Sequence, residues 1–396
     1  MTFSSRVPTD LGSNRLTQAV QQARAEGRPV VDLTESNPTR AGFEYPPDLL
    51  APLAHPRGLV YEPSPFGLLD ARRAVARDYE RRGTTISPDR IVLTSSTSDA
   101  YSLLFKLLAD ARDEVLVPRP SYPLFDHLAR LDEVTATPYD LEYTNRWTID
   151  VASVERAVSP RTRALLIVNP NNPTGSFVKR DELERLSRIC TTNDVALIAD
   201  EVFGDYELEP GAKADAGAVL DLRDALVFSL GGLSKSVGLP QVKLGWMAVG
   251  GPDALVERAL ERLELVCDTY LSVSTPVQAA ASELMERAAP VRAQIQARVA
   301  ANCRYLVEQA AAVPSCRVLL AEGGWYGIMQ VPSLGSEEDL VVHLVSELGV
   351  LVHPGYFFDF PRESYLVVSL LPPERVFADG VSRVLRHIGS QVGGHE

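Results

Sequence analysis

Residues 163–175 read RALLIVNPNNPTG, an apolar run that stops abruptly in a turn rich in proline, asparagine and glycine. Short apolar runs bounded by turn residues are typical of strands buried on both faces of a sheet. The same pattern recurs in the runs RIVLTSS (90–96), DEVLVPRP (113–120), VALIADEV (195–202), ALVFSLGG (225–232) and KLGWMAVGG (243–251). We therefore predict a sheet built from strands at these positions.

Amphipathic stretches separate the apolar runs. Residues 98–110 (SDAYSLLFKLLAD) and 179–190 (KRDELERLSRIC) both show the apolar spacing of a helix. Strands that alternate with helices predict an α/β fold, with a mostly parallel central sheet sandwiched by helices. In such folds, ligands bind at the carboxyl ends of the strands.

The rest of the chain predicts a second, smaller unit. Residues 252–312 are strongly helical in character, and the segment that follows them reads as short strands and helices. We expect the N-terminal segment, with one helix and a proline-rich loop, to pack against this C-terminal part. The predicted division is a large domain over residues 51–279 and a small α+β domain formed by residues 1–50 and 280–396.

The composition narrows the functional classes. The chain has 396 residues, a formal net charge of −13 and 45% hydrophobic residues, which is ordinary for a globular protein. An acidic chain is unsuited to coating nucleic acid or an anionic membrane, and we see neither a signal peptide nor an apolar run of membrane-spanning length. The four cysteines form no Cys-x-x-Cys pair. We expect free thiols, no metal site and a cytoplasmic location.

Polar residues follow the predicted strands at the points where the strands end. Because the carboxyl ends of parallel strands meet at one edge of a sheet, we expect these residues to converge there. They are Ser95 to Ser98, Arg119 to Tyr122, Asn169 to Gly175, Asp200 with Glu201, and Ser234 with Lys235.

Lys235 stands out among these residues, because it sits in a run of small and apolar residues, GGLSKSVGL. Burial disfavours the charged form of an amine. Proteins that bury a lysine often use the neutral amine as a nucleophile that forms a Schiff base. The alternative is a surface turn in which Lys235 and Lys243 are both solvated.

The edge suits a ligand that carries a phosphate, an aromatic ring nitrogen and an aldehyde. We place the phosphate at Ser96, Thr97 and Ser98, where the N-terminus of the predicted helix would attract an anion. Lys243 would add positive charge to the same place. The alternative is that these hydroxyl residues only cap the helix.

Three further residues each allow two interpretations. Asp200 would hold a ring nitrogen protonated and so make the ring an electron sink, or it would cap a helix or pair with an arginine. Asn172 would donate a hydrogen bond to a ring oxygen, or it would only shape its turn. Tyr122 would stack on the ring, or it would be a core aromatic residue.

Taken together, these motifs carry a resemblance to a known family. The chain resembles the class I/II aminotransferases among the fold-type I enzymes, which depend on pyridoxal 5′-phosphate (PLP). The most specific part is NPNNPTG, then ADEV, then SK with a cationic residue eight positions later, in that order. The resemblance extends from DLTESNPTRAGFEYP (32–46) to YLVVSLLPPERV (365–376). It implies a fold-type I PLP-transferase fold.

The resemblance also implies a role for each matching residue, and a homodimer with shared active sites. Lys235 is expected to hold PLP as a Schiff base and to move the substrate proton. The other matches are Asp200 on the pyridine nitrogen, Asn172 on the ring hydroxyl, Tyr122 stacked on the ring, Ser96, Thr97, Ser98 and Lys243 at the phosphate, and Tyr61 reaching the phosphate of the neighbouring subunit.

Four positions depart from the family pattern. Lys243 and Phe203 stand where the family usually has arginine and tyrosine, and Gly232 stands where it usually has serine. The largest departure is Val367, at the position of the arginine that grips the substrate carboxylate in a bidentate pair. The usual carboxylate anchor is therefore absent from this position.

Two explanations for Val367 remain open. Arg40, in the SNPTRAGF loop together with Asn37, would bind the carboxylate alongside Asn172, or the amine substrate does not present its carboxylate in the usual way. We favour Arg40. Trp325, Tyr326 and Tyr270 are either pocket residues or packing residues.

We predict a PLP-dependent aminotransferase that moves an amino group between an L-amino acid and a 2-oxo acid. The alternative is a PLP-dependent lyase, racemase or oxidase on the same scaffold. A third hypothesis, a non-catalytic PLP-binding regulator, is less favoured because the chain shows no added DNA-binding module and no basic patch.

Overall fold

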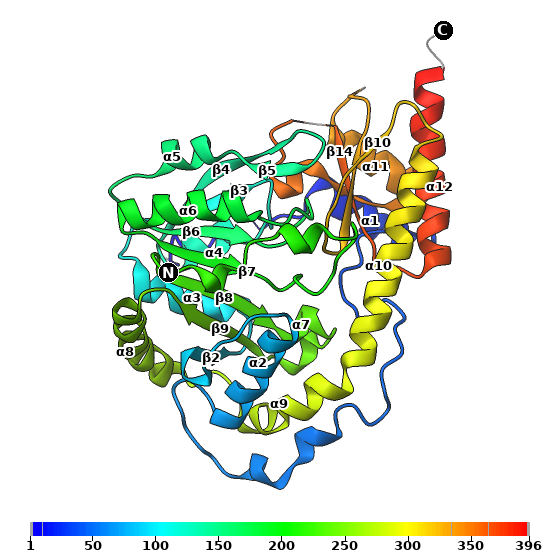
Figure 1. Ribbon diagram of the computed structural model, residues 1–396. Helices are drawn as coiled ribbons and strands as arrows, with labels where there is room; N and C mark the ends of the chain where they lie inside the picture. The colour runs from blue at the N-terminus through cyan, green and yellow to red at the C-terminus, as the bar shows by residue number, and fades with distance from the viewer. Residues whose placement is uncertain (1–2, 10, 334, 363, 394–396) are drawn as a thin grey trace.

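The structure, a computed structural model, describes residues 3–9, 11–333, 335–362 and 364–393. Its centre is a sheet of eight strands (Figure 1). In spatial order these are β2 (Ile91–Thr94), β9 (Gly245–Gly250), β8 (Val227–Gly232), β7 (Ala196–Asp200), β6 (Thr162–Val168), β3 (Glu114–Arg119), β4 (Thr135–Tyr143) and β5 (Trp147–Ile149). Strands β8, β7, β6, β3 and β4 pair in parallel, whereas β9 and β5 run antiparallel to their neighbours.

The strands predicted from the apolar runs are confirmed, and all of them lie in this sheet. Strands β4 and β5 were not predicted. Strand β4 reads TATPYDLEY, with a proline inside it and few buried residues, because it lies near the edge of the sheet and is only partly covered. A strand of this kind lacks the continuous apolar run by which a central parallel strand is recognised.

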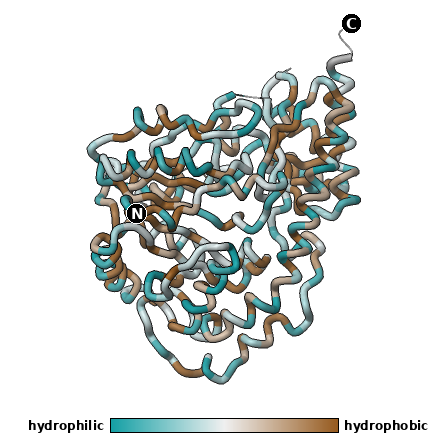
Figure 2. The backbone as a smooth tube through the Cα atoms, viewed as in Figure 1, coloured by the Kyte–Doolittle hydropathy of each residue, from teal (hydrophilic) through white to brown (hydrophobic). Residues whose placement is uncertain are grey.

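Helices cover both faces of the sheet, as predicted for this α/β fold. One face packs against α2 (Leu69–Arg81), α5 (Val151–Ala157), α6 (Arg180–Asn193) and α9 (Thr275–Arg287). The other face packs against α3 (Thr97–Leu108), α4 (Phe125–Leu131) and α8 (Asp253–Tyr270). Figure 2 shows hydrophobic residues gathered along the strands between these two layers.

A smaller antiparallel sheet lies beside the large one. Its order is β10 (Arg317–Leu319), β11 (Tyr326–Gln330), β14 (Tyr365–Ser369) and β13 (His353–Pro354). Strand β1 (Val31–Asp32) pairs in parallel with β12 (Val350–Leu351), so the N-terminal segment packs against the C-terminal part. The core here includes residues of α1 (Arg15–Ala25), α10 (Ala289–Ala310), α11 (Glu337–Leu348) and α12 (Glu374–Gly393). The division into domains at residues 50 and 280 stays a prediction.

The remaining helices are short. The one-turn helix α7 (Leu233–Ser236) follows β8 directly. Among the described residues, no helix is long and apolar enough to cross a membrane. The 3₁₀ helices are Ala51–Ala54, Pro56–Leu59, Pro88–Arg90, Ala212–Asp215, Val219–Asp221, Pro240–Val242 and Gly355–Phe358.

Candidate active site

The predicted polar edge exists at the carboxyl ends of β6, β7 and β8, which are neighbours in the sheet. The register pairs Val168 with Asp200 and Asp200 with Leu230, so the three strands end nearly level. Asn169 therefore begins its turn beside Asp200, and α7 brings Lys235 to the same edge.

Lys235 is half-buried, and its Nζ lies 5.1 Å from the ring centroid of Trp325 and 5.9 Å from that of Phe203. Within the described part of the chain, Nζ donates no hydrogen bond. Burial lowers the pKa of Lys235, and the negative charge of Asp200 offsets this only in part. Lys235 is therefore not the solvated lysine of a surface turn, and its surroundings favour the neutral amine that a nucleophile needs.

Asp200 is the last residue of β7 and is buried. The Tyr101 hydroxyl donates to Oδ2 at 2.8 Å, and the backbone N–H of Val202 donates to Oδ1 at 3.1 Å. Burial raises the pKa of Asp200 to about 6, against the effect of these two bonds. The carboxylate is thus held by Tyr101 and Val202 rather than by an arginine, and it is still ionised at neutral pH.

Tyr101 is not predicted from the sequence, because it has the pattern of an ordinary core aromatic residue of α3. Its ring is buried beside Phe125, with centroids 5.4 Å apart, and its hydroxyl points at Asp200. Burial and the charge of Asp200 both raise the pKa of Tyr101 well above its usual value. The hydroxyl therefore stays protonated and remains a donor to Asp200.

The N-terminus of α3 has the features of an anion site. Ser96 is the N-cap, and its hydroxyl accepts a hydrogen bond from the Asp99 N–H at 3.1 Å. Among the described residues, the N–H groups of Thr97 and Ser98 have no acceptor, which is the usual state of the first turn of a helix. A phosphate would find these donors at the positive end of the helix dipole.

Lys243 lies on the neighbouring strand connection, two residues before β9. Gly245 packs so closely on Ser96 that a Cβ on it would lie 2.9 Å from the Ser96 carbonyl carbon. Lys243 is exposed, and its backbone has the left-handed φ of 59°. Its ammonium group is thus on a turn beside the α3 N-terminus and is not tied to another side chain that the structure describes.

Asn172 and Tyr122 line the same edge. Asn172 is buried, yet its Oδ1 has no hydrogen-bond partner among the residues that the structure describes. Tyr122 is 38% exposed and contacts Phe125 edge-on, so it is not a core aromatic residue. Burial and the charge of Asp200 raise the pKa of Tyr122, which indicates that this ring and Asp200 are close in space.

Tyr61 lies in an exposed segment of the chain. It is 74% exposed and lines a small cavity with Ser272, whose hydroxyl donates to Asp99 in the first turn of α3. Leu59 and Val60, its neighbours in the chain, are exposed as well. Three consecutive exposed apolar residues are typical of a surface that another protein covers.

Val367, at the position where the family usually has the carboxylate-binding arginine, lies inside strand β14. Its side chain is fully buried in β14, and its cross-strand neighbours are Ile328 and His353. The loop that holds Arg40 runs past the end of the same strand, because the Ser369 hydroxyl donates to the Glu35 carbonyl at 2.6 Å. The structure therefore brings this loop close to the strand that lacks the arginine.

The two predicted substrate residues of this loop differ in their surroundings. Arg40 is exposed, and its guanidinium contacts no acceptor among the described residues. The Asn37 Oδ1 accepts hydrogen bonds from the N–H and the hydroxyl of Thr39, so this oxygen shapes the loop. Arg40 has a free guanidinium for a ligand, whereas Asn37 has only its amide nitrogen.

The three aromatic candidates also differ. Trp325 is buried and lies over the Lys235 amine. Burial raises the pKa of Tyr326 to about 12, and both Ser36 and Tyr122 are near its hydroxyl. Tyr270, at the end of α8, is exposed and lies 5.8 Å from the Lys106 amine. Trp325 and Tyr326 therefore border the site, and nothing places Tyr270 there.

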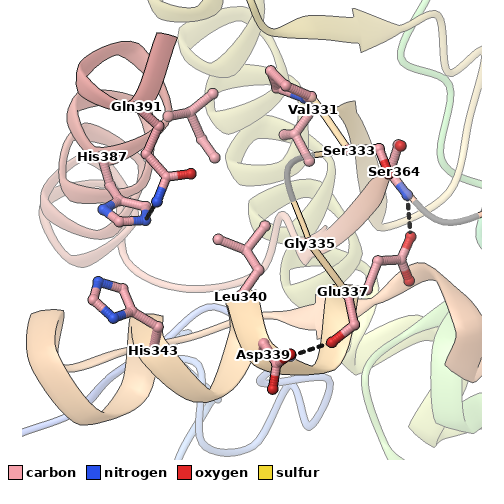
Figure 3. Close-up of a pocket in the computed structure, with 13 residues that line it drawn as sticks. Val331, Ser333, Gly335, Glu337, Asp339, Leu340, His343, Ser364, His387 and Gln391 are labelled. Atoms are coloured by element: carbon pink, nitrogen blue, oxygen red, sulfur yellow. Dashed lines mark hydrogen bonds between the residues drawn. The ribbon is translucent and has the colours of Figure 1, made fainter. Parts of the chain in front are cut away.

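The site is distinct from a cavity of about 290 Å³ between α11 and α12. Figure 3 shows this cavity with His343 and His387 at one side and Glu337 at the other. The residues that line it include none of the predicted site residues in the described part of the chain.

The residues at the sheet edge fit PLP. The Oδ1 of the buried Asn172, which has no hydrogen-bond partner among the described residues, offers an acceptor for the ring hydroxyl. The free N–H groups at the start of α3 suit the phosphate. A buried carboxylate at Asp200 suits a protonated ring nitrogen, and a half-buried amine at Lys235 suits an aldehyde.

The comparison with known families agrees with this arrangement. Residues 30–376 match the family model described as "Aminotransferase class I and II". The chain belongs to this aminotransferase family. Both the family and its fold imply PLP as the cofactor, and the lyase, racemase or oxidase alternative is not favoured.

Two relatives of this aminotransferase span nearly the whole chain. It is 27% identical to the alanine aminotransferase of Mycobacterium tuberculosis strain H37Rv, over 93% of this chain and 87% of the relative. It is 26% identical to the glutamate-pyruvate aminotransferase AlaA of Haemophilus influenzae, over 92% of this chain and 91% of the relative.

Solved structures support the fold-type I architecture. The alanine aminotransferase of Pyrococcus furiosus superposes with a TM-score of 0.87, at 22% identity, and the match covers 98% of this chain and all (100%) of that one. An aminotransferase from Escherichia coli superposes with a TM-score of 0.84 at 23% identity, over 98% of each chain. The expected fold class is therefore confirmed.

Proposed function

We propose that this aminotransferase binds PLP on Lys235 and moves an amino group between an L-amino acid and a 2-oxo acid. The observation that carries the proposal is the convergence of Lys235, Asp200 and the α3 N-terminus at one edge of the sheet. A nucleophilic amine, a buried carboxylate and an anion site are the three features that PLP requires of a protein.

PLP, when bound, supplies an electron sink that eases removal of the substrate Cα proton. The residues of the chain move the proton and orient the ring. The neutral Lys235 amine would accept the substrate Cα proton and later donate it to another carbon of the bound molecule, because burial keeps this amine from holding a proton permanently. Ionised Asp200 would hold the ring nitrogen of a bound PLP protonated, and the Tyr101 hydroxyl keeps the carboxylate in place. Asn172 and the N–H groups of Thr97 and Ser98 fix the orientation of the ring.

The names of the relatives suggest substrates to test. The two relatives described above are named for alanine and for the glutamate–pyruvate pair. We propose L-alanine and L-glutamate as amino donors and their oxo acids as acceptors. The test is to incubate the PLP-loaded protein with L-glutamate and pyruvate and to measure both products. L-Alanine and 2-oxoglutarate formed in equal amounts would support the proposal, and no exchange with any pair from a panel of L-amino acids and 2-oxo acids would refute it.

Arg40 is the proposed anchor for the substrate carboxylate. Replacing Arg40 with alanine should raise KM for the amino acid by about 10- to 100-fold, because a hydrogen bond to a charged group is worth about 1.5–3 kcal/mol. Arg24, an exposed arginine on α1, provides the matched control, and Arg24→Ala should leave KM unchanged. Steady-state kinetics with both variants decide the point. A KM for Arg40→Ala equal to that of the control would move the anchor elsewhere.

We propose a homodimer in which Tyr61 completes the partner's site. The exposed residues Leu59, Val60 and Tyr61 form the apolar segment that a second copy would cover. The cytoplasmic location expected from the cysteines stays a prediction.

Subunit mixing tests the shared site. Lys235→Ala subunits and Tyr61→Ala subunits should each be weakly active alone. Their mixed dimer should contain one intact site, so random pairing restores about a quarter of wild-type activity. Activity assays before and after the two variants are unfolded and refolded together measure this. A mixture that shows only the average of the two parents would contradict sharing of the site.

A further inference from the structure

Lys235 is carried by α7, a helix of a single turn. The last four carbonyl groups of any helix lack hydrogen-bond partners within the helix. In a helix of one turn, such as α7, nearly every carbonyl group is in this position. The Tyr206 hydroxyl donates to the Lys235 carbonyl at 2.5 Å and lies 3.3 Å from the Ser236 carbonyl. The Arg292 Nε donates to the same Ser236 carbonyl at 2.9 Å. Two distant side chains thus supply the donors at the end of α7.

Tyr206 is itself fixed in place. It is fully buried, and its backbone accepts a hydrogen bond from the Gly324 N–H and donates one to the Phe203 carbonyl. Its ring packs edge-on against Trp325, with centroids 5.2 Å apart, and Trp325 in turn lies over the Lys235 amine. Burial raises the pKa of Tyr206 well above its usual value, so the hydroxyl remains a donor.

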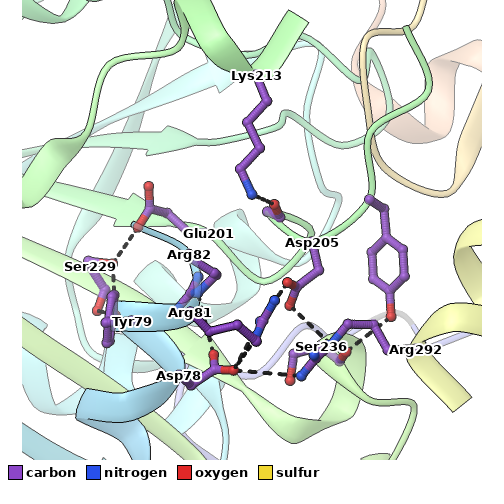
Figure 4. A network of polar contacts seen from close by, with 12 residues as sticks. Asp78, Tyr79, Arg81, Arg82, Glu201, Asp205, Lys213, Ser229, Ser236 and Arg292 are labelled. Atoms are coloured by element: carbon purple, nitrogen blue, oxygen red, sulfur yellow. Dashed lines mark hydrogen bonds and ion pairs between the residues drawn. The ribbon is translucent and has the colours of Figure 1, made fainter. Parts of the chain in front are cut away.

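Arg292 is held by a network of buried charges. Asp205 and Asp78 lie 3.7 Å and 3.6 Å from its guanidinium, and both also pair with Arg81 at 2.6 Å and 2.9 Å. Figure 4 shows these side chains meeting between α2, the segment after β7 and α10, with Ser236 at the end of the network. The aspartates are almost fully buried, so the network is rigid compared with a surface ion pair.

We propose that Tyr206 and Arg292 form a clamp that positions Lys235, and that neither touches the reacting atoms. The proposal rests on the proposed role of Lys235. The Lys235 Nζ lies over the rings of Trp325 and Phe203 and makes no hydrogen bond of its own among the described residues, so its position depends on where the backbone of α7 is held. Misplacement of a reacting group by about 1 Å can cost about 100-fold in rate.

The test compares Tyr206→Phe with Tyr139→Phe. Tyr139 is a matched control, because it is also buried and its hydroxyl donates to a backbone carbonyl, that of Leu166, at 2.8 Å, on another strand. Both variants should lose similar amounts of thermal stability, since each loses one buried hydrogen bond. Only Tyr206→Phe should lower kcat by about 10- to 100-fold with little change in KM.

A second readout does not depend on turnover. In the protein freed of PLP, an amine-reactive reagent followed by peptide mapping gives the labelling rate of Lys235 over a range of pH. This rate should change in Tyr206→Phe and not in Tyr139→Phe. Arg292→Lys, which keeps the charge, should shift the rate in the same direction and keep the measurement possible if Tyr206→Phe does not fold.

The outcomes separate the clamp from the function on which it rests. If borohydride fixes PLP on Lys235 while Tyr206→Phe and Arg292→Lys match Tyr139→Phe in labelling rate and kcat, the clamp alone is wrong. If borohydride fixes PLP on another lysine, the proposed function fails and the clamp fails with it. A selective change in both readouts, with PLP on Lys235, supports the clamp.

Discussion

Lys235→Ala should abolish covalent attachment of PLP and reduce amino transfer by at least about 10⁴-fold. General acid–base catalysis alone contributes about 10²–10⁴-fold, and loss of this lysine also removes the nucleophile that would hold the cofactor. The burial that lowers the pKa of Lys235 is what makes its amine suitable for both tasks. The measurement is a peptide mass map of PLP-loaded protein after borohydride reduction, together with steady-state kinetics.

The chain makes the mapping simple, because its only lysines are Lys106, Lys179, Lys213, Lys235 and Lys243. Lys106→Ala is the matched control, since Lys106 lies on α3 and pairs with Asp132 at the surface. The control should keep the cofactor and its activity. Undiminished transfer in Lys235→Ala, or PLP fixed on a different lysine of the wild-type protein, would show that the nucleophile has been misassigned.

Asp200→Asn is expected to lower kcat/KM by about 10²–10⁴-fold. The neutral amide keeps the shape of the carboxylate but not its charge, and breaking a buried ion pair costs about 3–5 kcal/mol. Tyr101→Phe should have a smaller effect, because the Val202 N–H still holds the carboxylate. Kinetics of the two variants test this order. If kcat/KM of Asp200→Asn stayed within tenfold of the wild-type value, which corresponds to about 1.4 kcal/mol, the result would contradict a role for the charge of Asp200.

A stability measurement without PLP gives the same residue an independent test. Burial raises the pKa of Asp200 from its ordinary 3.8 to about 6, so ionising it in the folded protein costs stability. This cost is absent below about pH 4 and grows between about pH 4 and pH 6. Above that range it stays at about 3 kcal/mol. Asp200→Asn should therefore be more stable than wild type at pH 8 and not at pH 4. If the stability difference between Asp200→Asn and wild type were the same at pH 4 and pH 8, ionisation of the buried Asp200 would not cost stability.

The sequence predicts the central strands well for a physical reason. Strands such as β6 and β7 are buried on both faces, so they need continuous apolar runs, and their site residues follow directly in the turns. Strand β4 escapes prediction because one side is partly open and Pro138 interrupts it. A strand can therefore be recognised from its sequence when both of its faces are buried, and it is missed when one face is partly open.

The candidate site also contains residues that the sequence predicts and residues that it does not. Lys235, Asp200 and Asn172 can be proposed from the sequence because each ends or follows a strand at the edge where ligands bind in such folds. Tyr101, Tyr206 and Arg292 are not, because each donates to an atom of the site from a position 29 to 99 residues away in the chain. From the sequence alone, Tyr101 and Tyr206 are expected to be core packing residues. Arg292 is expected to lie on the solvent-exposed, polar side of a helix. Only the folded arrangement shows where their donors point.

The most direct test of the central claim follows the nitrogen atom. PLP-loaded protein is mixed with ¹⁵N-labelled L-alanine or ¹⁵N-labelled L-glutamate, with no 2-oxo acid added. We predict about one equivalent of oxo acid per subunit, after which the reaction stops with the label on the protein, as in a two-step exchange mechanism. Adding a 2-oxo acid should then release the label as a new amino acid. Continuous release of labelled ammonia, with no label retained by the protein, would contradict amino transfer.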